Sequence, residues 1–218
     1  MSYQSIAQIQ AAFEALPSSN ATARQAATER QNQLTKPPGS LGKLEELAIF
    51  MAAWQGLQKP EINKAQALVF AGNHGVCAQG VNPFPQEVTV AMVENFKNGG
   101  AAINQLCKEN GADLDVISLE LETPTADITE GAALTEAELL DAFKRGFNAI
   151  DKHADIVILG EMGIGNSTIS AALCAGAFGG SGADWVGMGT GSDQVGIQRK
   201  ADVVDRAVAI NADLIKTP

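Results

Sequence analysis

The sequence has few of the residues that build metal centres or disulfide frameworks. Among 218 residues there are only three cysteines and two histidines, and no CxxC or HExxH spacing occurs. The cysteines, Cys77, Cys107 and Cys174, are scattered and odd in number, which is typical of reduced thiols in the cytoplasm. Without paired ligands at a metal-binding spacing, we expect no structural or catalytic metal.

Basic runs and long apolar runs are also missing. The chain carries 15 Lys and Arg against 25 Asp and Glu, a net charge of −10, so nucleic acid and anionic membranes are poor partners. The start MSYQSIAQIQ lacks the basic and apolar regions of a signal peptide, and no stretch is long enough to span a bilayer. With 45% apolar and 18% charged residues, the composition indicates an ordinary soluble globular protein in the cytoplasm.

Helix and strand patterns alternate along the chain. Short apolar runs predict parallel strands at Ala65–Ala71, Leu114–Leu119, Asp155–Leu159 and Asp184–Val186. Helical patterns cover Ser5–Leu16, Thr22–Leu34, Leu44–Trp54, a segment from Gln86 past Phe96, Ala101–Cys107, a segment from the N-cap Thr135 to His153, a segment from Asn166, and Gln194–Ile215. This order predicts an α/β fold, a Rossmann-like parallel sheet with helices on both faces plus a small helical N-terminal subdomain. We place the subdomain at residues 1–60 and the α/β nucleotide-binding domain at residues 61–218.

The glycine-rich stretch after the third strand is the strongest candidate for a binding site. Gly160-Glu161-Met162-Gly163-Ile164-Gly165 leads into Asn166, Ser167 and Thr168, residue types that cap a helix. Such a turn leaves backbone N–H groups facing outward at the positive end of the helix, where they can hold a phosphate or carboxylate. Glu161 lies in this turn and suits hydroxyls or a cationic ring beside the anion. The same junction also occurs in α/β proteins that bind nothing there. The NAD motif GxGxxG is not met, because Thr168 replaces its third glycine.

A second glycine turn, Gly187-Met188-Gly189-Thr190-Gly191, follows the fourth predicted strand, and Lys200 falls in the first turns of the next helix. Lysine suits phosphate as a compact charge, so we prefer a ligand in a crevice shared by both turns over a solvated lysine.

The loop after the first strand offers further candidates. Asn73 and His74 stand where parallel strands present ligands, although His74 could instead tie down its own long loop. The Phe84-Pro85 pair can form a rigid wall for a flat ring or can seal the end of the sheet.

Five segments in order, TKPPGSLGKLE, FAGNHGV, GVNPFPQEVT, GEMGIGNSTISAA and GMGTGSDQVGIQRK, resemble the nicotinate-nucleotide:dimethylbenzimidazole phosphoribosyltransferase family over essentially the whole chain. The resemblance implies a cytoplasmic homodimer that works without a cofactor. It implies transfer of the phosphoribosyl group of nicotinate mononucleotide to 5,6-dimethylbenzimidazole, with inversion and release of nicotinate. The product, α-ribazole 5′-phosphate, is the lower-ligand nucleotide of cobalamin.

The resemblance also places roles on residues. Glu161 is implied as the catalytic carboxylate at the substrate's ribose, and the loop Phe84-Pro85-Gln86 as the wall for the benzimidazole-type acceptor. The expected substrate-binding residues are Asn73, His74, Phe84, Pro85, Gln86, Gly163, Gly165, Asn166, Ser167, Thr168, Gly187, Gly189, Thr190 and Lys200.

Two departures from the family pattern matter. Asn73-His74-Gly75 stands where the family commonly has Asp-His-Gly, which removes a charge. The family's catalytic base is a glutamate in a motif well beyond Pro218. We therefore expect residues 1–218 alone not to make the product. The alternative function is a truncated, non-catalytic module that binds a phosphoribosyl nucleotide.

Overall fold

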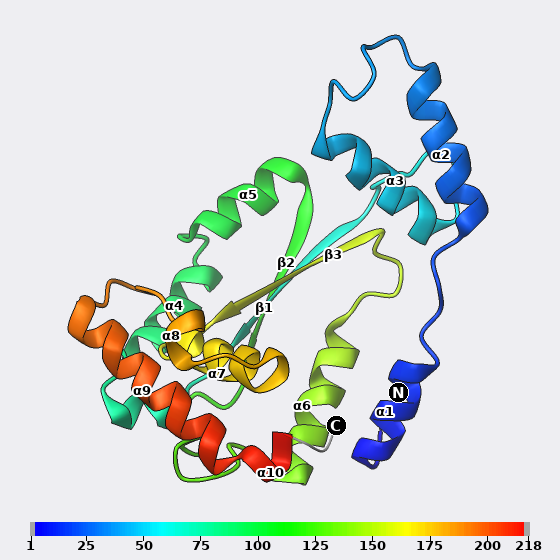
Figure 1. Cartoon of the computed structure of the whole chain (residues 1–218). Coiled ribbons are helices and arrows are strands. Elements are labelled where there is room, and N and C mark those ends of the chain that lie inside the picture. Colours follow the sequence, from blue (N-terminus) through cyan, green and yellow to red (C-terminus); the bar gives the residue numbers. More distant parts are fainter. Residues whose placement is uncertain (1–2, 216–218) are drawn as a thin grey trace.

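The computed structural model describes residues 3–215, which form a parallel sheet surrounded by helices (Figure 1). The strands are β1 (Ala65–Ala71), β2 (Ala112–Ser118) and β3 (Ile156–Met162), in the order β2-β1-β3. β1 can occupy the centre because its run AQALVFA is apolar except for Gln66, and the residues from Gln66 to Val69 are all buried. The predicted α/β fold class is confirmed.

The helices take up most of the remaining chain. In chain order they are α1 (Ile6–Glu14), α2 (Ala21–Gln33), α3 (Lys43–Gln55), the 3-10 helix η1 (Gly75–Gln79), α4 (Glu87–Lys97), α5 (Ala102–Asn110), α6 (Glu136–Ala149), α7 (Asn166–Phe178), α8 (Gly182–Trp185), α9 (Gln194–Ile210) and α10 (Ala212–Ile215). The predicted cap of α6 is confirmed, since the Glu138 N–H donates to Thr135 Oγ1 over 3.3 Å and the Thr135 N–H to Glu138 Oε2 over 2.7 Å.

Helices cover both faces of the sheet. On one face, Val69 of β1 packs with Phe96 of α4 and with Ala101 at the start of α5. Gln66 points to the opposite face, because successive side chains of a strand alternate. Its Nε2 donates to the carbonyl of Ala149, the last residue of α6, over 2.9 Å. The sheet is thus sandwiched between α4 and α5 on one side and α6 on the other.

Gln66 is a buried amide whose hydrogen-bonding groups are partnered. Besides the bond to Ala149, its Nε2 donates to Asp115 Oδ2 on β2 over 3.0 Å. Its Oε1 accepts from the Asp151 N–H, just after α6, over 2.9 Å. Burial of an amide is tolerated when its donors and acceptor are satisfied in this way.

The predicted fourth strand at Asp184–Val186 is wrong. Residues Gly182–Trp185 form the short helix α8, at whose start the N–H and the Oγ of Ser181 both donate to Asp184 Oδ2 over 2.8 Å. The second glycine turn therefore follows a helix. The S-x-x-D cap was readable from the sequence, but the apolar Trp185-Val186 pair suggested a strand.

Among the element boundaries that differ from the prediction, two have a clear physical cause. β3 continues to Met162, so Glu161 lies on the strand, paired with Phe70 of β1, and not in the turn. The last predicted helix is broken at Asn211, whose Nδ2 donates to the carbonyls of Ile128 and Ala207 over 2.8 Å each. That side chain competes with the backbone for hydrogen bonds and ends α9.

The first three helices do not form one bundle. α2 and α3 pack on each other and project from the end of the sheet where β1 begins, while α1 lies beside α6 (Figure 1). The domain boundary at residue 60 stays a prediction. No helix of residues 3–215 is long and apolar enough to cross a membrane.

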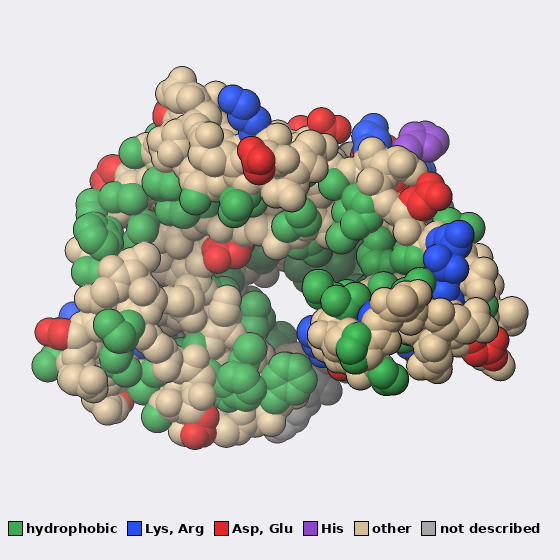
Figure 2. Space-filling view, turned by 90° about the horizontal axis from the view of Figure 1, so that it is seen from above, with side chains coloured by type: hydrophobic (Ala, Val, Ile, Leu, Met, Phe, Trp, Pro, Cys, Tyr) green, Lys and Arg blue, Asp and Glu red, His purple; other side chains and the backbone are tan. Residues whose placement is uncertain are grey.

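Large apolar side chains are exposed at several positions. Leu159 on β3, Leu173 and Phe178 on α7, and Val195 on α9 are 67–77% exposed. Seen from above, hydrophobic side chains also gather around a hollow in the middle of the molecule (Figure 2).

Candidate functional site

The carboxyl ends of β1 and β3 lie next to each other. Phe70 is paired with Glu161 and Ala71 with Met162, and the Gly72 N–H donates to the Met162 carbonyl over 3.0 Å. The segment after β1 and the first glycine turn after β3 therefore start side by side. This is the edge at which open α/β sheets bind their ligands.

The first glycine turn is held in place by hydrogen bonds to its own surroundings. The Ile164 N–H donates to Thr89 Oγ1 of α4 over 3.1 Å, and the Ile164 carbonyl accepts from Cys77 Sγ over 3.2 Å. The Asn166 N–H donates to the Gly163 carbonyl over 3.2 Å. These two N–H groups therefore bond to protein atoms and do not face outward, while the predicted role of the turn in holding an anion stays a prediction.

The two glycines of this turn allow close packing. A Cβ at Gly163 would lie 2.2 Å from Asn166 Oδ1 and 2.3 Å from the Gly72 carbonyl oxygen. A Cβ at Gly165, where φ is +98°, would lie 2.8 Å from Cys77 Sγ. Glycine is therefore required at both positions, for contact with protein atoms.

The residues predicted to cap α7 lie inside the helix, whose cap is a glycine without a side-chain bond. Asn166 instead turns back: its Oδ1 lies 2.5 Å from His74 Nε2, and its Nδ2 donates to the Glu161 carboxylate. Thr168 is fully buried and its hydroxyl has no partner among the described residues. Its predicted role in substrate binding stays a prediction. Ser167 remains exposed.

Lys200 on α9 is a buried cation. Its residue is 3% exposed, and its Nζ donates to the carbonyls of Gly187 and Met188 over 3.3 and 3.5 Å. No carboxylate of residues 3–215 forms an ion pair with it. Burial lowers the pKa of Lys200, because the charged ammonium has lost solvent. The alternative of a solvated helix lysine is wrong.

Lys200 and Ser167 meet at the second glycine turn. A Cβ at Gly189, where φ is +54°, would lie 2.9 Å from Lys200 Nζ and 3.0 Å from Ser167 Oγ. Thr190 is exposed in the same turn. An ammonium, a hydroxyl and the first turn of α7 therefore converge, which is a suitable arrangement for an anion.

In the loop after β1, two predicted site residues support the backbone. Asn73 is 6% exposed and its Nδ2 donates over 3.0 Å to a carbonyl of the β2–α6 connection. Gln86 Nε2 donates to the His74 carbonyl over 2.7 Å. Phe84, 48% exposed, and Pro85 stay on the surface in front of α4.

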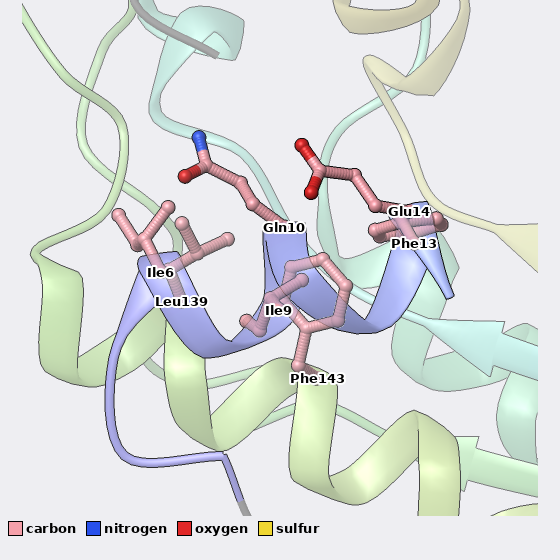
Figure 3. Close-up of a pocket in the computed structure, with 7 residues that line it drawn as sticks. All are labelled: Ile6, Ile9, Gln10, Phe13, Glu14, Leu139 and Phe143. Carbon is pink, nitrogen blue, oxygen red and sulfur yellow. The ribbon is translucent and has the colours of Figure 1, made fainter. Parts of the chain in front are cut away.

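Two cavities lie outside the predicted site. One of about 470 Å³ lies between α1 and α6, where apolar side chains face each other (Figure 3); it is lined by Ile6, Ile9, Gln10, Phe13, Glu14, Leu139 and Phe143. The other, of about 900 Å³, lies between the β2–α6 connection and α6, where Arg145 is paired with Glu120 and Asp141. Neither was foreseen from the sequence, because both depend on what packs against α6.

The remaining sulfur and imidazole groups do not gather into a metal site. Cys77, Cys107 and Cys174 are all unpaired. Among residues 3–215, no three His, Cys, Asp or Glu side chains come together in a way that could hold a metal ion.

Comparison with known proteins places this fold and these turns in a family. A family model described as phosphoribosyltransferase matches residues 16–218. The chain belongs to this phosphoribosyltransferase family. The match includes all the predicted site residues and excludes α1. The cavity between α1 and α6 therefore involves a segment that the family model does not cover.

Individual members of the phosphoribosyltransferase family are closely similar to this chain in sequence. The nicotinate-nucleotide–dimethylbenzimidazole phosphoribosyltransferase of Rhodobacter capsulatus is 59% identical over 210 residues, which are 96% of this chain and 63% of that protein. The enzyme of the same name from Roseobacter denitrificans is 52% identical over 210 residues, 96% of this chain and 62% of that protein.

Solved structures agree with this relationship. The crystal structure of CobT from Thermus thermophilus matches with a TM-score of 0.76 and 39% identity, over 86% of this chain and 62% of that chain. A structure of nicotinate-nucleotide–dimethylbenzimidazole phosphoribosyltransferase from the same organism gives 0.77 and 37%, over 87% and 62%. This chain thus spans less than two thirds of the length of these relatives.

Proposed function

We propose that this chain binds nicotinate mononucleotide and takes part in moving its phosphoribosyl group to 5,6-dimethylbenzimidazole, giving nicotinate and α-ribazole 5′-phosphate. The names of the similar enzymes support this reaction. The observation that carries the proposal is Lys200, a buried ammonium with no carboxylate partner among the described residues, beside the second glycine turn.

The phosphate of the nucleotide is the natural counterion for Lys200. A buried cation without a counterion is costly, and a bound phosphate dianion offsets that cost. Ser167 Oγ stands close enough to the same point to donate a second hydrogen bond, and Gly189 leaves the space free of a side chain. In this proposal the phosphate lies between the second glycine turn and the start of α7, with Thr190 at its outer side.

Glu161 then belongs at the ribose. In the reaction the bond from C1′ to the pyridine nitrogen breaks, and its electrons neutralise the cationic ring, so nicotinate leaves without being protonated. A bond from C1′ to a benzimidazole nitrogen forms on the opposite face, and the N–H proton of the acceptor passes to a general base or to water. Positive charge develops at C1′ meanwhile. An exposed carboxylate at the end of β3 is suited to stabilise that charge.

The acceptor ring would lie against Phe84 and Pro85, which are exposed at the start of α4. Gln86 supports this wall from behind through its bond to the His74 carbonyl. We further propose a cytoplasmic location, which the three unpaired cysteines support. We propose a homodimer on the basis of the family resemblance; sedimentation of the purified chain tests it.

Calorimetry with nicotinate mononucleotide tests the proposal. The chain is expected to bind it, and Lys200→Ala should weaken binding by about 1.5–3 kcal/mol, the range for a charge-assisted hydrogen bond. Nicotinate riboside, which lacks the phosphate, is the matched ligand and should lose little affinity in this variant. Absence of binding to the folded chain would overturn the proposal.

A second measurement separates catalysis from binding. The chain is incubated with nicotinate mononucleotide and dimethylbenzimidazole, and the release of nicotinate is followed by chromatography. Turnover supports the transferase, whereas binding without turnover favours the alternative of a non-catalytic binding module.

A further inference from the structure

Three polar side chains from different segments form a row at the edge of the sheet. Glu161 is the penultimate residue of β3, Asn166 begins α7, and His74 follows β1. Asn166 Nδ2 donates to the Glu161 carboxylate, and Asn166 Oδ1 lies 2.5 Å from His74 Nε2. Glu161 is the exposed end of the row, while Asn166 and His74 are partly buried behind it.

The hydrogen-bonding chemistry of these groups fixes which one donates and which one accepts at each step of the row. An ionised carboxylate only accepts hydrogen bonds, so Asn166 must turn its NH₂ group toward Glu161. Its Oδ1 then faces His74 as an acceptor, and the imidazole must carry its proton on Nε2 to donate. Burial favours this neutral form, because it lowers the pKa of His74 more than Asn166 and Glu161 raise it.

The backbone fixes the imidazole end of the row. The His74 carbonyl accepts from Gln86 Nε2 over 2.7 Å. On its two sides, the Asn73 carbonyl accepts from the Thr125 N–H over 3.2 Å, and the Gly75 N–H donates to the Thr125 carbonyl over 2.9 Å. A Cβ at Gly75 would lie 2.5 Å from that carbonyl oxygen, so glycine lets the two backbones approach this closely. The backbone on both sides of His74 is thus tied to the segment around Thr125.

The first glycine turn leaves room for the row. Asn166 Oδ1 occupies the space where a side chain at position 163 would start, since a Cβ there would lie 2.2 Å away. The turn therefore lets the Asn166 amide fold back over it, between Glu161 and His74. This explains why a glycine at 163 precedes an asparagine at 166 in this turn.

We propose that Asn166 and His74 are positioning residues for Glu161: two successive hydrogen bonds hold its carboxylate above the strand ends, and His74 itself does not touch the nucleotide. The inference rests on the proposed function, in which Glu161 meets the ribose. It changes the predicted role of His74 from substrate contact to support, and it gives Asn166 a task other than phosphate binding.

Nuclear magnetic resonance tests the row without any ligand. The chain has only two histidines, so a His153→Gln variant, altered at an exposed position after α6, assigns the signals of His74. At neutral pH, His74 should be neutral with its proton on Nε2, and that proton should exchange slowly enough to be observed. In Asn166→Ala the proton signal should disappear. A His74 protonated on Nδ1, or an Nε2 proton unaffected by Asn166→Ala, would contradict the row.

A double-mutant cycle on nicotinate mononucleotide binding tests what the row does. His74→Leu should raise the dissociation constant about five- to tenfold, the effect of about one lost hydrogen bond. In a Glu161→Ala background the same change should matter less than about twofold, because nothing is left to position. His74→Gln, which keeps an N–H donor near Nε2, should retain most of the affinity, and His153→Gln serves as the unaffected control.

The outcomes separate the two proposals. If His74→Leu weakens binding equally with and without Glu161, then His74 contacts the ligand and the positioning role is wrong. If the folded chain does not bind the nucleotide, the proposed function fails, and the resonance experiment alone decides whether the row exists. Circular dichroism of each variant shows that lost binding does not come from lost folding.

Discussion

Gln66 and Lys200 are both buried polar residues, yet they differ in how they are satisfied. The amide of Gln66 has three partners: two accept from its NH₂ group and one donates to its oxygen. The ammonium of Lys200 has only two long bonds to carbonyls and no negative charge beside it. The first arrangement satisfies the buried groups within the fold, whereas the second leaves a buried charge without a counterion among the described residues. A buried polar side chain that the fold leaves unsatisfied is the better marker of a ligand site.

This contrast predicts that Lys200→Met stabilises the folded chain while it weakens nucleotide binding. Methionine has a similar length and fills the space without an unpaired charge, so the free energy of unfolding should rise by about 1–3 kcal/mol. Urea unfolding at neutral pH measures it, and calorimetry on the same sample measures binding. A variant that is less stable than the parent chain would show that Lys200 supports the fold.

The pH dependence of the free energy of unfolding provides a second test of the buried charge of Lys200. Burial lowers the pKa of Lys200 below its ordinary value of 10.5. Between the lowered pKa and 10.5 the unfolded chain binds more protons than the folded chain, so this residue makes stability rise with pH in that window. Below the lowered pKa both states are protonated and the contribution is constant. The difference in stability between Lys200→Met and the parent chain should therefore shrink as the pH rises.

At the scale of elements, α8 shows how a short helix is set by its neighbours. Gly182 is buried, and a Cβ there would lie 2.3 Å from the carbonyl oxygen of Ala201 on α9. Its N–H donates to Asp205 Oδ1 over 2.6 Å. The backbone of α8 thus rests directly on α9, the helix that carries Lys200, and sets where the second glycine turn begins.

We expect Gly182→Ala to destabilise the chain by about 1–3 kcal/mol, because the added methyl group forces the two helices apart. Gly146→Ala in α6 is the matched control: nothing lies within 4 Å of a Cβ there, so alanine should raise stability by about 0.5–1 kcal/mol through helix propensity. Urea unfolding measures both. If Gly182→Ala is neutral, α8 does not rest on α9 as described.

The elements that could be predicted from sequence are those with strong local signals. The strand Ala65–Ala71 and the cap at Thr135 depend on an apolar run and on a pair three residues apart. The prediction of a fourth strand at Asp184–Val186 was wrong because three residues carry too little local information. The packing of Gly182 against α9 decides that a short helix forms there. Similarly, only the pairing with β1 places Glu161 on a strand.

The candidate site could be predicted in its residue types more than in its geometry. The sequence indicates that Glu161 and Lys200 belong to one site, and the structure brings Lys200 to Ser167 through the second glycine turn. The sequence could not show that the Ile164 N–H of the first turn bonds to Thr89, because Thr89 comes from a helix far away in the chain. Nor could it show that Thr168 is buried, since burial depends on tertiary packing.

At the scale of the whole molecule, the outer strand β3 stands out. It is paired on one side only, with β1, within the described residues. Leu159 in the middle of it is 72% exposed and its neighbour Ile158 is 45% exposed. A long unpaired strand edge with exposed apolar side chains invites pairing with other chains.

We therefore expect the purified chain to self-associate with rising concentration and Leu159→Lys to reduce this, since a lysine on an edge strand opposes pairing. Leu106→Lys is the matched control, because Leu106 is 60% exposed but lies on α5, away from any strand edge. Light scattering against concentration measures both variants. Equal effects would show that general charge, and not the strand edge, governs association.

Gln66 also couples parts of the chain that are far apart in sequence. Its partners lie 49, 83 and 85 residues away, on β2 and around the end of α6. Moving either β2 or the end of α6 away from Gln66 leaves a buried amide group unsatisfied. This penalises states in which only one of these two segments has opened. The end of α6 and the strand β2 should thus open together as one cooperative unit, with matching amide hydrogen-exchange rates. In Gln66→Leu, which has no such groups to satisfy, the two segments should exchange independently.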